Sequence, residues 1–441
     1  GSNSATNCCR SASARRVVTE GRTPMEKETF VYADLAGTAR PVGRLWTRVR
    51  QGRESATFQY DDARLDHPER FALEPALTLG QGAHHTPAGR ALFGALGDSA
   101  PDRWGRALMA RAERRTARAE ERPPRTLTEL DYLLNVSDRS RQGALRFSAE
   151  PGGPFLARAD ADPVPPLIEL PRLLAASDRV HDEDDNDELL AFLLAPGSSL
   201  GGARPKASVV DIDGTLAIAK FPKHDDEIDT VRWEAVALSL AGHAGIKVPE
   251  WRIERVGDRH VLIVKRFDRN GDERIPFLSA MSMLGADDGD ARSYLEIADA
   301  LRQHGAESRA DREALWRRIV FSILISNTDD HLRNHGFLYE GSAGWRLSPA
   351  YDLNPVPVDL KPRFLSTAID LEDHEASVEL ALTVAPYFEL DENAALAVAK
   401  DVALSVAEWR SVASKLGLPH PDIERMASAF EHDDLISALT Y

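Results

Sequence analysis

SNTDDHLRNHGF, residues 326–337, is the stretch around which the chain is organised. An apolar run, residues 316–325, leads into it, a short hairpin is expected after it, and a further carboxylate, Asp352, follows. Clusters of Asp and Asn after a helix are most often turn and capping residues, because both side chains bond to nearby backbone. The loop by itself is therefore as consistent with a structural role as with a chemical one.

The spacing of these polar residues favours phosphoryl transfer. That reaction requires an acceptor hydroxyl held in line and Mg²⁺ held against the phosphates. In protein kinases a catalytic-loop Asp accepts the hydroxyl proton, and an Asn a few residues later and a more distant Asp bind the metal. Here Asp329 is the expected base, and Asn334 and Asp352 are the expected Mg²⁺ ligands. The spacing from Asp329 to Asn334 matches the kinase loop, although the preceding His-Arg is absent.

Length and composition are those of a globular protein with two or three domains. The chain has 441 residues, of which 43% are hydrophobic and 28% charged, and no apolar run approaches a membrane span. The two cysteines, Cys8 and Cys9, are adjacent, so no disulfide framework is expected and a reducing cytoplasm is predicted. The formal net charge of −16 argues against nucleic-acid binding through the overall field of the chain.

Changes in composition divide the chain into four parts. Residues 1–27 are interpreted as a disordered leader or an expression remnant, since they lack the apolar centre of a signal peptide. Residues 28–152 begin with alternating segments that predict a small antiparallel sheet, followed by an Arg-rich helix reaching to about Glu121 whose face we expect to be solvated. Residues 153–270 are the expected nucleotide-binding lobe, and residues 271–441, with helical periodicity almost throughout, are the expected catalytic lobe.

A glycine-containing loop, residues 197–206, begins the part of the expected nucleotide-binding lobe that could contact phosphates. Glycines such as Gly201 and Gly202 let backbone N–H groups approach phosphate oxygens closely, and Lys206 ends the loop. The loop is neither a Walker motif nor the kinase Gly-x-Gly-x-x-Gly, so by itself it is weak evidence for nucleotide binding.

A lysine and a glutamate after this loop suggest how phosphates are bound. Lys220 ends the second, apolar strand of a hairpin predicted from Asp213-Gly214. Burying the charged ammonium of a lysine at such a place without an anionic partner costs free energy. Glu234 lies in the first turn of the helix expected over residues 230–245. A strand Lys followed by a helix Glu is the kinase arrangement for positioning ATP phosphates, although an acid in a first helical turn is also ordinary capping.

In this order, the motifs resemble the HipA family, the serine/threonine-kinase toxins of bacterial toxin–antitoxin modules. The most specific matching segments are residues 99–106, 131–134, 143–147, 201–206, 266–269, 327–334 and 351–352. The resemblance implies an α+β, two-lobed protein-kinase-like fold with a β-rich N-terminal subdomain and an all-helical C-terminal lobe.

The resemblance also assigns roles to individual residues. It makes Asp329 the catalytic base, Asn334 and Asp352 the Mg²⁺ ligands, Lys220 the lysine that binds ATP phosphates, and Phe267 part of the adenine hinge. The remaining residues of the implied ATP site are Gly201, Gly202, Lys206, Glu234 and His331. The implied cofactors are ATP and Mg²⁺.

Partners and regulation are likewise implied by the resemblance. Family members phosphorylate aminoacyl-tRNA synthetases and so halt translation, and they are neutralised by a dimeric helix-turn-helix antitoxin of the HipB type that binds operator DNA; no membrane is involved. A serine of the glycine loop is autophosphorylated in the family, and Ser199 matches it, with Ser198 as second choice. A dianion in that loop would repel ATP phosphates, so self-inhibition is expected.

The sequence departs from the family pattern at two positions, and it leaves two alternative functions open. Lys265 stands where the family's hinge motif commonly begins with an acid, and Asp330 replaces a Gly after the base. A small-molecule kinase is one alternative, since related two-lobed folds also phosphorylate metabolites. A catalytically silent corepressor of an antitoxin is the other, although the intact set of Asp329, Asn334 and Asp352 argues against it.

Overall fold

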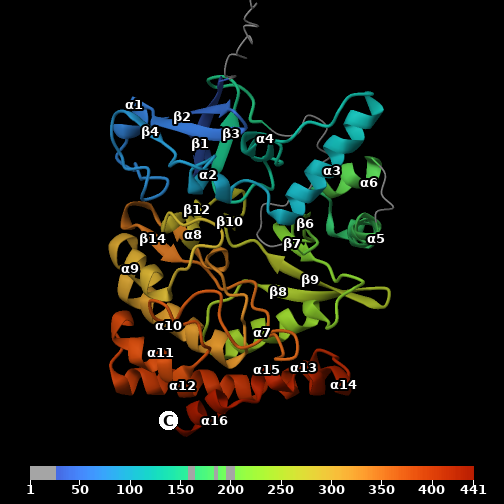
Figure 1. Ribbon diagram of the computed structural model, residues 1–441, viewed down its shortest axis with the longest axis vertical. Helices are drawn as coiled ribbons and strands as arrows, with labels where there is room; N and C mark the ends of the chain where they lie inside the picture. Colours follow the sequence, from blue (N-terminus) through green and yellow to red (C-terminus); the bar gives the residue numbers. More distant parts are fainter. Residues whose placement is uncertain (1–25, 157–163, 183–186, 195–203) are drawn as a thin grey trace, which may run out of the picture.

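The computed structural model describes residues 26–156, 164–182, 187–194 and 204–441. Residues 1–25 of the expected leader and residues 197–203 of the expected glycine loop, among them Ser198, Ser199, Gly201 and Gly202, lie outside the described residues, whereas Glu26 and Lys27 belong to strand β1. The fold is α+β, with sheets toward the N-terminal end and helices toward the C-terminal end, as the sequence predicted (Figure 1).

A five-stranded antiparallel sheet forms the N-terminal end of the molecule. Its strands, in the spatial order β4-β3-β2-β1-β5, are β1 (Glu26–Leu35), β2 (Thr38–Arg50), β3 (Arg53–Tyr60), β4 (Ala83–His85) and β5 (Leu145–Ser148). Both tight turns place two successive residues at positive φ, with Gly37 at 73° and Gly52 at 76°, as the twist of a hairpin requires. Pro41 lies inside β2 beside a register shift, where the ladder is already irregular.

Four helices lie in the chain between strands β3 and β5 of this sheet: α1 (Asp62–Leu65), α2 (Gly94–Asp98), α3 (Arg103–Ala119) and α4 (Glu129–Leu134). The Arg-rich helix is α3; Asp102 caps it by accepting a hydrogen bond from Gly105 N at 2.8 Å. Apolar residues of α3 pack with α5 (Leu170–His181) and α6 (Asp187–Leu194) and with the next sheet in one buried cluster. This helix of the N-terminal region therefore also supports the nucleotide lobe.

The middle of the chain forms a four-stranded antiparallel sheet in the order β6-β7-β9-β8. Its strands are β6 (Lys206–Val210), β7 (Leu216–Lys220), β8 (Trp251–Val256) and β9 (Arg259–Lys265), and a small hairpin of β10 (Arg269–Asn270) and β11 (Glu273–Arg274) follows. Helix α7 (Thr230–His243) connects β7 to β8 and is capped by Asp229. The turn between β6 and β7 uses Gly214 at φ 83°, in agreement with the Asp-Gly signal of the sequence.

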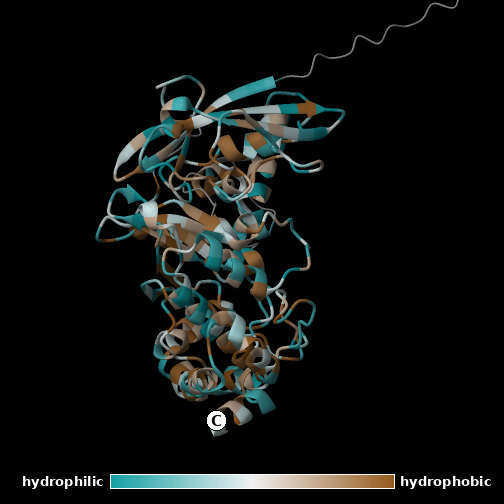
Figure 2. Ribbon diagram, turned by 90° about the vertical axis from the view of Figure 1, so that its left-hand side faces the viewer, coloured by the Kyte–Doolittle hydropathy of each residue, from teal (hydrophilic) through white to brown (hydrophobic). Residues whose placement is uncertain are grey.

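The C-terminal lobe is built mainly from helices. They are α8 (Ala280–Met283), α9 (Tyr294–His304), α10 (Ser308–Leu324), α11 (Val378–Val384), α12 (Glu392–Ala407), α13 (Trp409–Lys415), α14 (His420–Arg425), α15 (Ala427–Phe430) and α16 (Asp433–Thr440). Helix α10 is central, and Trp316, Ile319 and Ile323 on it are fully buried. Viewed from the side, the helices of this lobe carry both hydrophilic and hydrophobic residues (Figure 2), as expected for helices that share one core. No helix in the described ranges is long and apolar enough to cross a membrane.

A small sheet adds to the helices of this lobe and corrects the expectation that it is all-helical. The strands are β12 (Phe277–Ser279), β13 (Gly336–Tyr339) and β14 (Trp345–Leu347). The β13–β14 hairpin was expected, but the pairing of β13 with β12 was not, because it joins residues far apart in sequence. Gly336 permits that pairing: a Cβ there would lie 2.4 Å from Cε2 of Phe277.

A buried glutamate anchors α2 in the N-terminal region. The Oε2 atom of Glu74 accepts a hydrogen bond from Ala95 N at 2.5 Å, in the first turn of α2. Burial raises the pKa of Glu74 to about 7, although the bond from Ala95 acts in the opposite direction. The folded protein therefore binds a proton at this group in a range, from about pH 4.5 to pH 7, where the unfolded chain does not.

We expect Glu74 to make the protein less stable as the pH rises through this range. A folded-state pKa near 7 corresponds to a loss of about 3 kcal/mol between about pH 4.5 and pH 8. Glu74→Gln should remove this part of the pH dependence, because the amide keeps an acceptor for Ala95 but does not ionise. Urea unfolding at several pH values measures the effect, with Glu28→Gln, which changes an exposed residue of β1, as control. Parallel profiles for Glu74→Gln and the parent would contradict it.

Candidate active site

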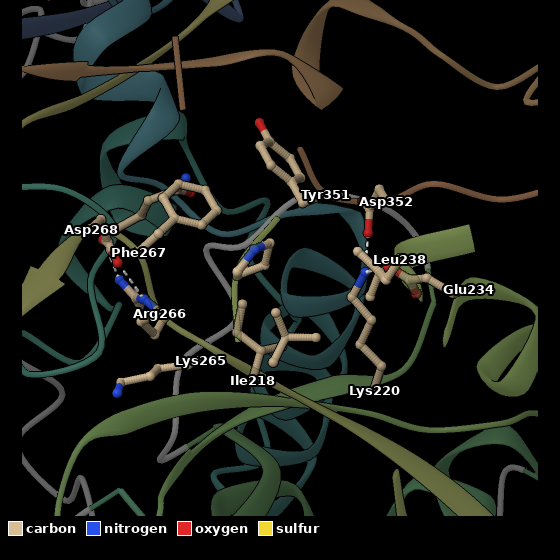
Figure 3. A pocket seen from close by; sticks show the side chains of 13 residues that line it. Ile218, Lys220, Glu234, Leu238, Lys265, Arg266, Phe267, Asp268, Tyr351 and Asp352 are labelled. Atoms are coloured by element: carbon tan, nitrogen blue, oxygen red, sulfur yellow. Dashed lines mark hydrogen bonds and ion pairs between the residues drawn. The ribbon is translucent and has the colours of Figure 1, made fainter. Parts of the chain in front are cut away.

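Three charged side chains from separate elements meet in a pocket that is lined by the four-stranded sheet, by α7 and by the segment after β14 (Figure 3). Lys220 at the end of β7 donates a hydrogen bond to Oε1 of Glu234 on α7 at 2.5 Å. The same ammonium contacts the carboxylate of Asp352, in the segment that follows β14. The structure thus brings together the strand lysine, the helix glutamate and one expected metal ligand.

The charges of this cluster are strongly coupled. Burial alone would lower the pKa of Lys220, but Asp352 and Glu234 outweigh it and raise that pKa above its usual value. Burial also favours protonation of Asp352, yet the charge of Lys220 holds the pKa of Asp352 below its ordinary value. Burial raises the pKa of Glu234 even beside Lys220. One cation and two carboxylates leave an excess negative charge, which a bound divalent cation would offset.

The pocket beside this cluster is open on one side, and the empty space in and in front of it amounts to about 530 Å³. Its lining residues include Ile218, Leu238, Val264, Phe267 and Tyr351. The rings of Phe267 and Tyr351 have centroids 5.5 Å apart and planes inclined by 33°. Apolar walls with a charged group at one end suit a planar aromatic ring linked to an anionic group.

A buried ion network fixes the backbone on the other side of the pocket (Figure 3). Asp268 accepts bonds from Arg266 Nη2 at 2.5 Å, from Arg269 Nη1 at 2.8 Å and from Gly143 N at 2.8 Å. Burial alone would raise the pKa of Asp268, but the two guanidinium groups hold it well below its usual range. Arg266 also donates to Ser140 O at 2.7 Å. The network therefore anchors the segment that carries Phe267 to the N-terminal region.

The polar loop after α10 carries the expected base and the second expected metal ligand. Asn334 is buried, and its Nδ2 donates to the backbone oxygen of Asp329 at 3.0 Å, which leaves the amide oxygen as a potential ligand. The side chain of Asp329 is 66% exposed, so an acceptor hydroxyl can reach its carboxylate. The two residues thus lie together, one open to solvent and one fixed.

Two hydrogen bonds join this loop to the segment that contains Asp352. Tyr351 donates its hydroxyl to Arg333 O at 2.8 Å, and Asn354 N donates to Oδ1 of Asn327 at 3.1 Å. Asp352 itself has φ of 55°, a left-handed conformation that costs free energy for a residue other than glycine. Such strain persists only where the surroundings impose it, here at the carboxylate that faces Lys220.

The donor atoms of Asn334 and Asp352 are of the chemical kind that Mg²⁺ prefers. Asn334 and Asp352 offer one amide oxygen and one carboxylate, which are hard ligands. No group of three or more His, Cys, Asp or Glu able to hold a metal occurs among the described residues. Mg²⁺ commonly binds through one or two protein oxygens together with phosphate oxygens and water, so the small donor set agrees with metal bound jointly with a nucleotide.

Asp330 has a structural role that the sequence did not reveal. It is buried and accepts bonds from Tyr294 Oη at 2.5 Å and Ser322 Oγ at 3.1 Å, while Nε2 of His335 lies 3.0 Å from its Oδ1. Burial alone would raise the pKa of Asp330, but His335 and the hydrogen bonds lower it. The departure from a Gly at this position therefore supplies an internal anchor for the loop.

Two residues of the expected ATP site lie away from the pocket lining. Lys206 is nearly inaccessible, with its Nζ 3.2 Å from Oδ2 of Asp102, so it joins β6 to the start of α3. His331 precedes a short 3-10 turn over Leu332–Asn334. Neither side chain is among those that line the pocket, but the charge of Lys206 favours the ionised form of Asp352.

Removing the buried cation tests the coupling of the cluster. We expect Lys220→Met to lower the free energy of unfolding at pH 7 by about 3–5 kcal/mol, because two buried carboxylates lose their partner. The deficit should shrink toward pH 5, since both pKa values rise without the cation and the folded state then takes up protons. Urea unfolding at both pH values measures this. Lys265→Met, which removes a more exposed lysine paired with Glu250 at 3.2 Å, is the control and should cost about 0–1 kcal/mol. A pH-independent deficit would argue against the coupling.

Comparison with known proteins agrees with this geometry. Relatives include a protein of Haemophilus influenzae named "Putative kinase", 27% identical over 36% of this chain and 54% of its own length. Another is "Putative kinase Y4mE" of Sinorhizobium fredii, 25% identical over 64% of this chain and 65% of its own length. The chain thus spans between about half and two thirds of the length of these curated relatives.

The fold also has a counterpart among solved structures. It matches a chain of the Shewanella oneidensis MR-1 toxin–antitoxin complex of HipA, HipB and operator DNA with a TM-score of 0.63 at 17% identity, covering 93% of this chain and 96% of that chain. The family model of the HipA-like C-terminal domain matches residues 198–429, more than half of the chain. The chain therefore belongs to the HipA family, as its motifs indicated.

Proposed function

We propose that the chain is an ATP-dependent serine/threonine protein kinase. The observation that carries the proposal is the contact of Lys220 with both Glu234 and Asp352 at one end of an apolar pocket. Lysine, glutamate and aspartate in this relation are the parts that position ATP phosphates and metal in protein kinases. Membership of the HipA family and the kinase names of its relatives support the same reaction.

In the proposed reaction the adenine lies between the apolar walls near Phe267, and the phosphates extend toward Lys220. Lys220 would bind phosphate oxygens, while Asn334 and Asp352 would hold Mg²⁺, whose charge stabilises the transferring group when bound. The exposed Asp329 would accept the proton of a serine or threonine hydroxyl. That oxygen forms a bond to the γ-phosphorus as the bond to the bridging oxygen of ADP breaks, and ADP leaves with the electron pair.

We further propose a toxin role in the cytoplasm for this kinase. An aminoacyl-tRNA synthetase is the proposed substrate, and a HipB-type helix-turn-helix antitoxin is the proposed partner that links the kinase to operator DNA. The solved complex with a similar fold contains HipB and operator DNA, which supports this partner. Self-inhibition would follow from phosphorylation of Ser199, or of Ser198, because the added dianion repels ATP phosphates.

Intact-mass spectrometry of the full chain with Mg-ATP tests the proposed activity. We expect the phosphatase-treated parent to gain one phosphate, and peptide mapping to place it on Ser199 or Ser198. Asp329→Asn should slow the gain at least about 100-fold, because the amide cannot accept the hydroxyl proton. Asp359→Asn, which alters an exposed carboxylate 3.5 Å from Arg425, is the matched control and should behave as the parent does. Equal rates for Asp329→Asn and the parent would refute the assignment of the base.

A further inference from the structure

An additional cation lies beside the proposed base. Nζ of Lys361 is 3.9 Å from Oδ1 of Asp329, and the two side chains are 43% and 66% exposed. Lys361 also donates a hydrogen bond to the backbone oxygen of Thr328 at 3.1 Å. The ammonium is therefore fixed against the loop that carries Asp329, on a different segment from Lys220.

The segment around Lys361 is bonded to this loop at several further points. Arg363 Nε donates to Ser326 Oγ at 3.2 Å, Ser366 Oγ donates to Thr328 O at 3.0 Å, and Thr367 Oγ1 donates to Asp330 O at 2.7 Å. Hydrogen bonds from side chains of residues 361–367 thus hold this segment along the loop. An ordinary surface lysine has no such support, and its position would average over many rotamers.

We propose that Lys361 is a catalytic residue that contacts the γ-phosphoryl group during transfer. This inference rests on the proposed kinase function. A reacting phosphorus lies about 3–3.5 Å from the attacking oxygen, which in turn lies about 3 Å from the base. An ammonium held 3.9 Å from Asp329 therefore lies within reach of an oxygen of that phosphoryl group.

The chemistry of the transfer gives this cation a role that Lys220 does not fill. Lys220 is bound between Glu234 and Asp352, on the side of the pocket where the phosphates of ATP enter. As the γ-phosphorus leaves the bridging oxygen of ADP and bonds to the acceptor oxygen, negative charge remains on its three non-bridging oxygens. Lys361 would stabilise this charge from the acceptor side, while the acceptor proton passes to Asp329.

An exposed lysine–aspartate pair without such a role contributes at most about 1 kcal/mol to stability and nothing specific to catalysis. The two interpretations therefore differ in what happens when the ammonium is removed. If Lys361 only forms a surface ion pair, its removal should have small and equal effects on ATP binding and on the rate of transfer. If Lys361 contacts the transferring group, its removal should weaken only the stabilisation of the transition state.

The test uses the full chain and the variants Lys361→Met and Lys361→Arg. Phosphate transfer to the phosphatase-treated chain itself, followed at a series of ATP concentrations, gives the maximal rate of transfer (kcat) and the ATP concentration at half that rate (KM), and calorimetry gives the affinities for Mg-ATP and for Mg-ADP with aluminium fluoride, a transition-state mimic. For Lys361→Met we expect kcat and affinity for the mimic to fall about 10–100-fold, with KM and affinity for Mg-ATP changed less than about twofold. Lys361→Arg should recover most of the loss, because it restores a cation. Lys415→Met, an exposed lysine at the end of α13, is the control.

The outcomes separate this inference from the function on which it rests. An active parent with a Lys361→Met variant whose kcat lies within about twofold would overturn the role of Lys361 alone. Equal losses in affinity for Mg-ATP and for the mimic would overturn it too, since uniform binding does not lower the barrier. A parent that neither transfers phosphate nor binds the mimic would overturn the kinase function together with this inference.

Discussion

The buried contact of Lys220 with Glu234 and Asp352 is the constraint on which the arrangement of the site depends. The three residues come from β7, from α7 and from the segment after β14, so one ammonium fixes the relation of a strand, a helix and the catalytic lobe. A buried ion pair is weak evidence for stability, because desolvation offsets the attraction. Burying this charge costs free energy. A ligand-binding role for a lysine held between two carboxylates explains that cost better than the packing of its side chain does.

A second buried charge fixes the opposite wall of the pocket. Asp268 accepts hydrogen bonds from Arg266, Arg269 and the backbone N–H of Gly143. These bonds connect the segment beside Phe267 to the N-terminal region. Helix α3 of that region packs against the sheet of the nucleotide lobe in the same apolar cluster as α5 and α6. The N-terminal part thus anchors the segment that carries Phe267 at the wall of the pocket.

The sequence predicted those parts of the fold and site that depend on local pattern. The place of Lys220 at the end of a strand could be predicted because an apolar run ended in a charge, and the β6–β7 turn could be predicted because Gly214 accepts a positive φ. Asn334 and Asp329 could be paired by their spacing. The structure places all of these as described above, and it places Glu234 against Lys220.

Features that depend on distant residues could not be predicted. The bonds of Asp330 to Tyr294, the pairing of β12 with β13, and the position of Lys361 beside Asp329 each join segments separated by more than 30 residues. Lys206 illustrates the converse: its place at the end of a glycine loop suggested phosphate binding, but its ammonium lies against Asp102 of another region. Local sequence carries no information on such partners, because burial and charge pairing are decided by the assembled fold.

The most direct test of the central claim is the affinity of the full chain for ATP, measured calorimetrically with and without Mg²⁺. If Lys220, Asn334 and Asp352 bind phosphates and metal jointly, ATP should bind at least about tenfold more tightly with Mg²⁺ than with chelator, a difference of about 1.4 kcal/mol. Asn334→Ala should lose most of that difference while it retains the metal-free affinity. Absence of ATP binding, or binding that Mg²⁺ does not strengthen, would contradict the account.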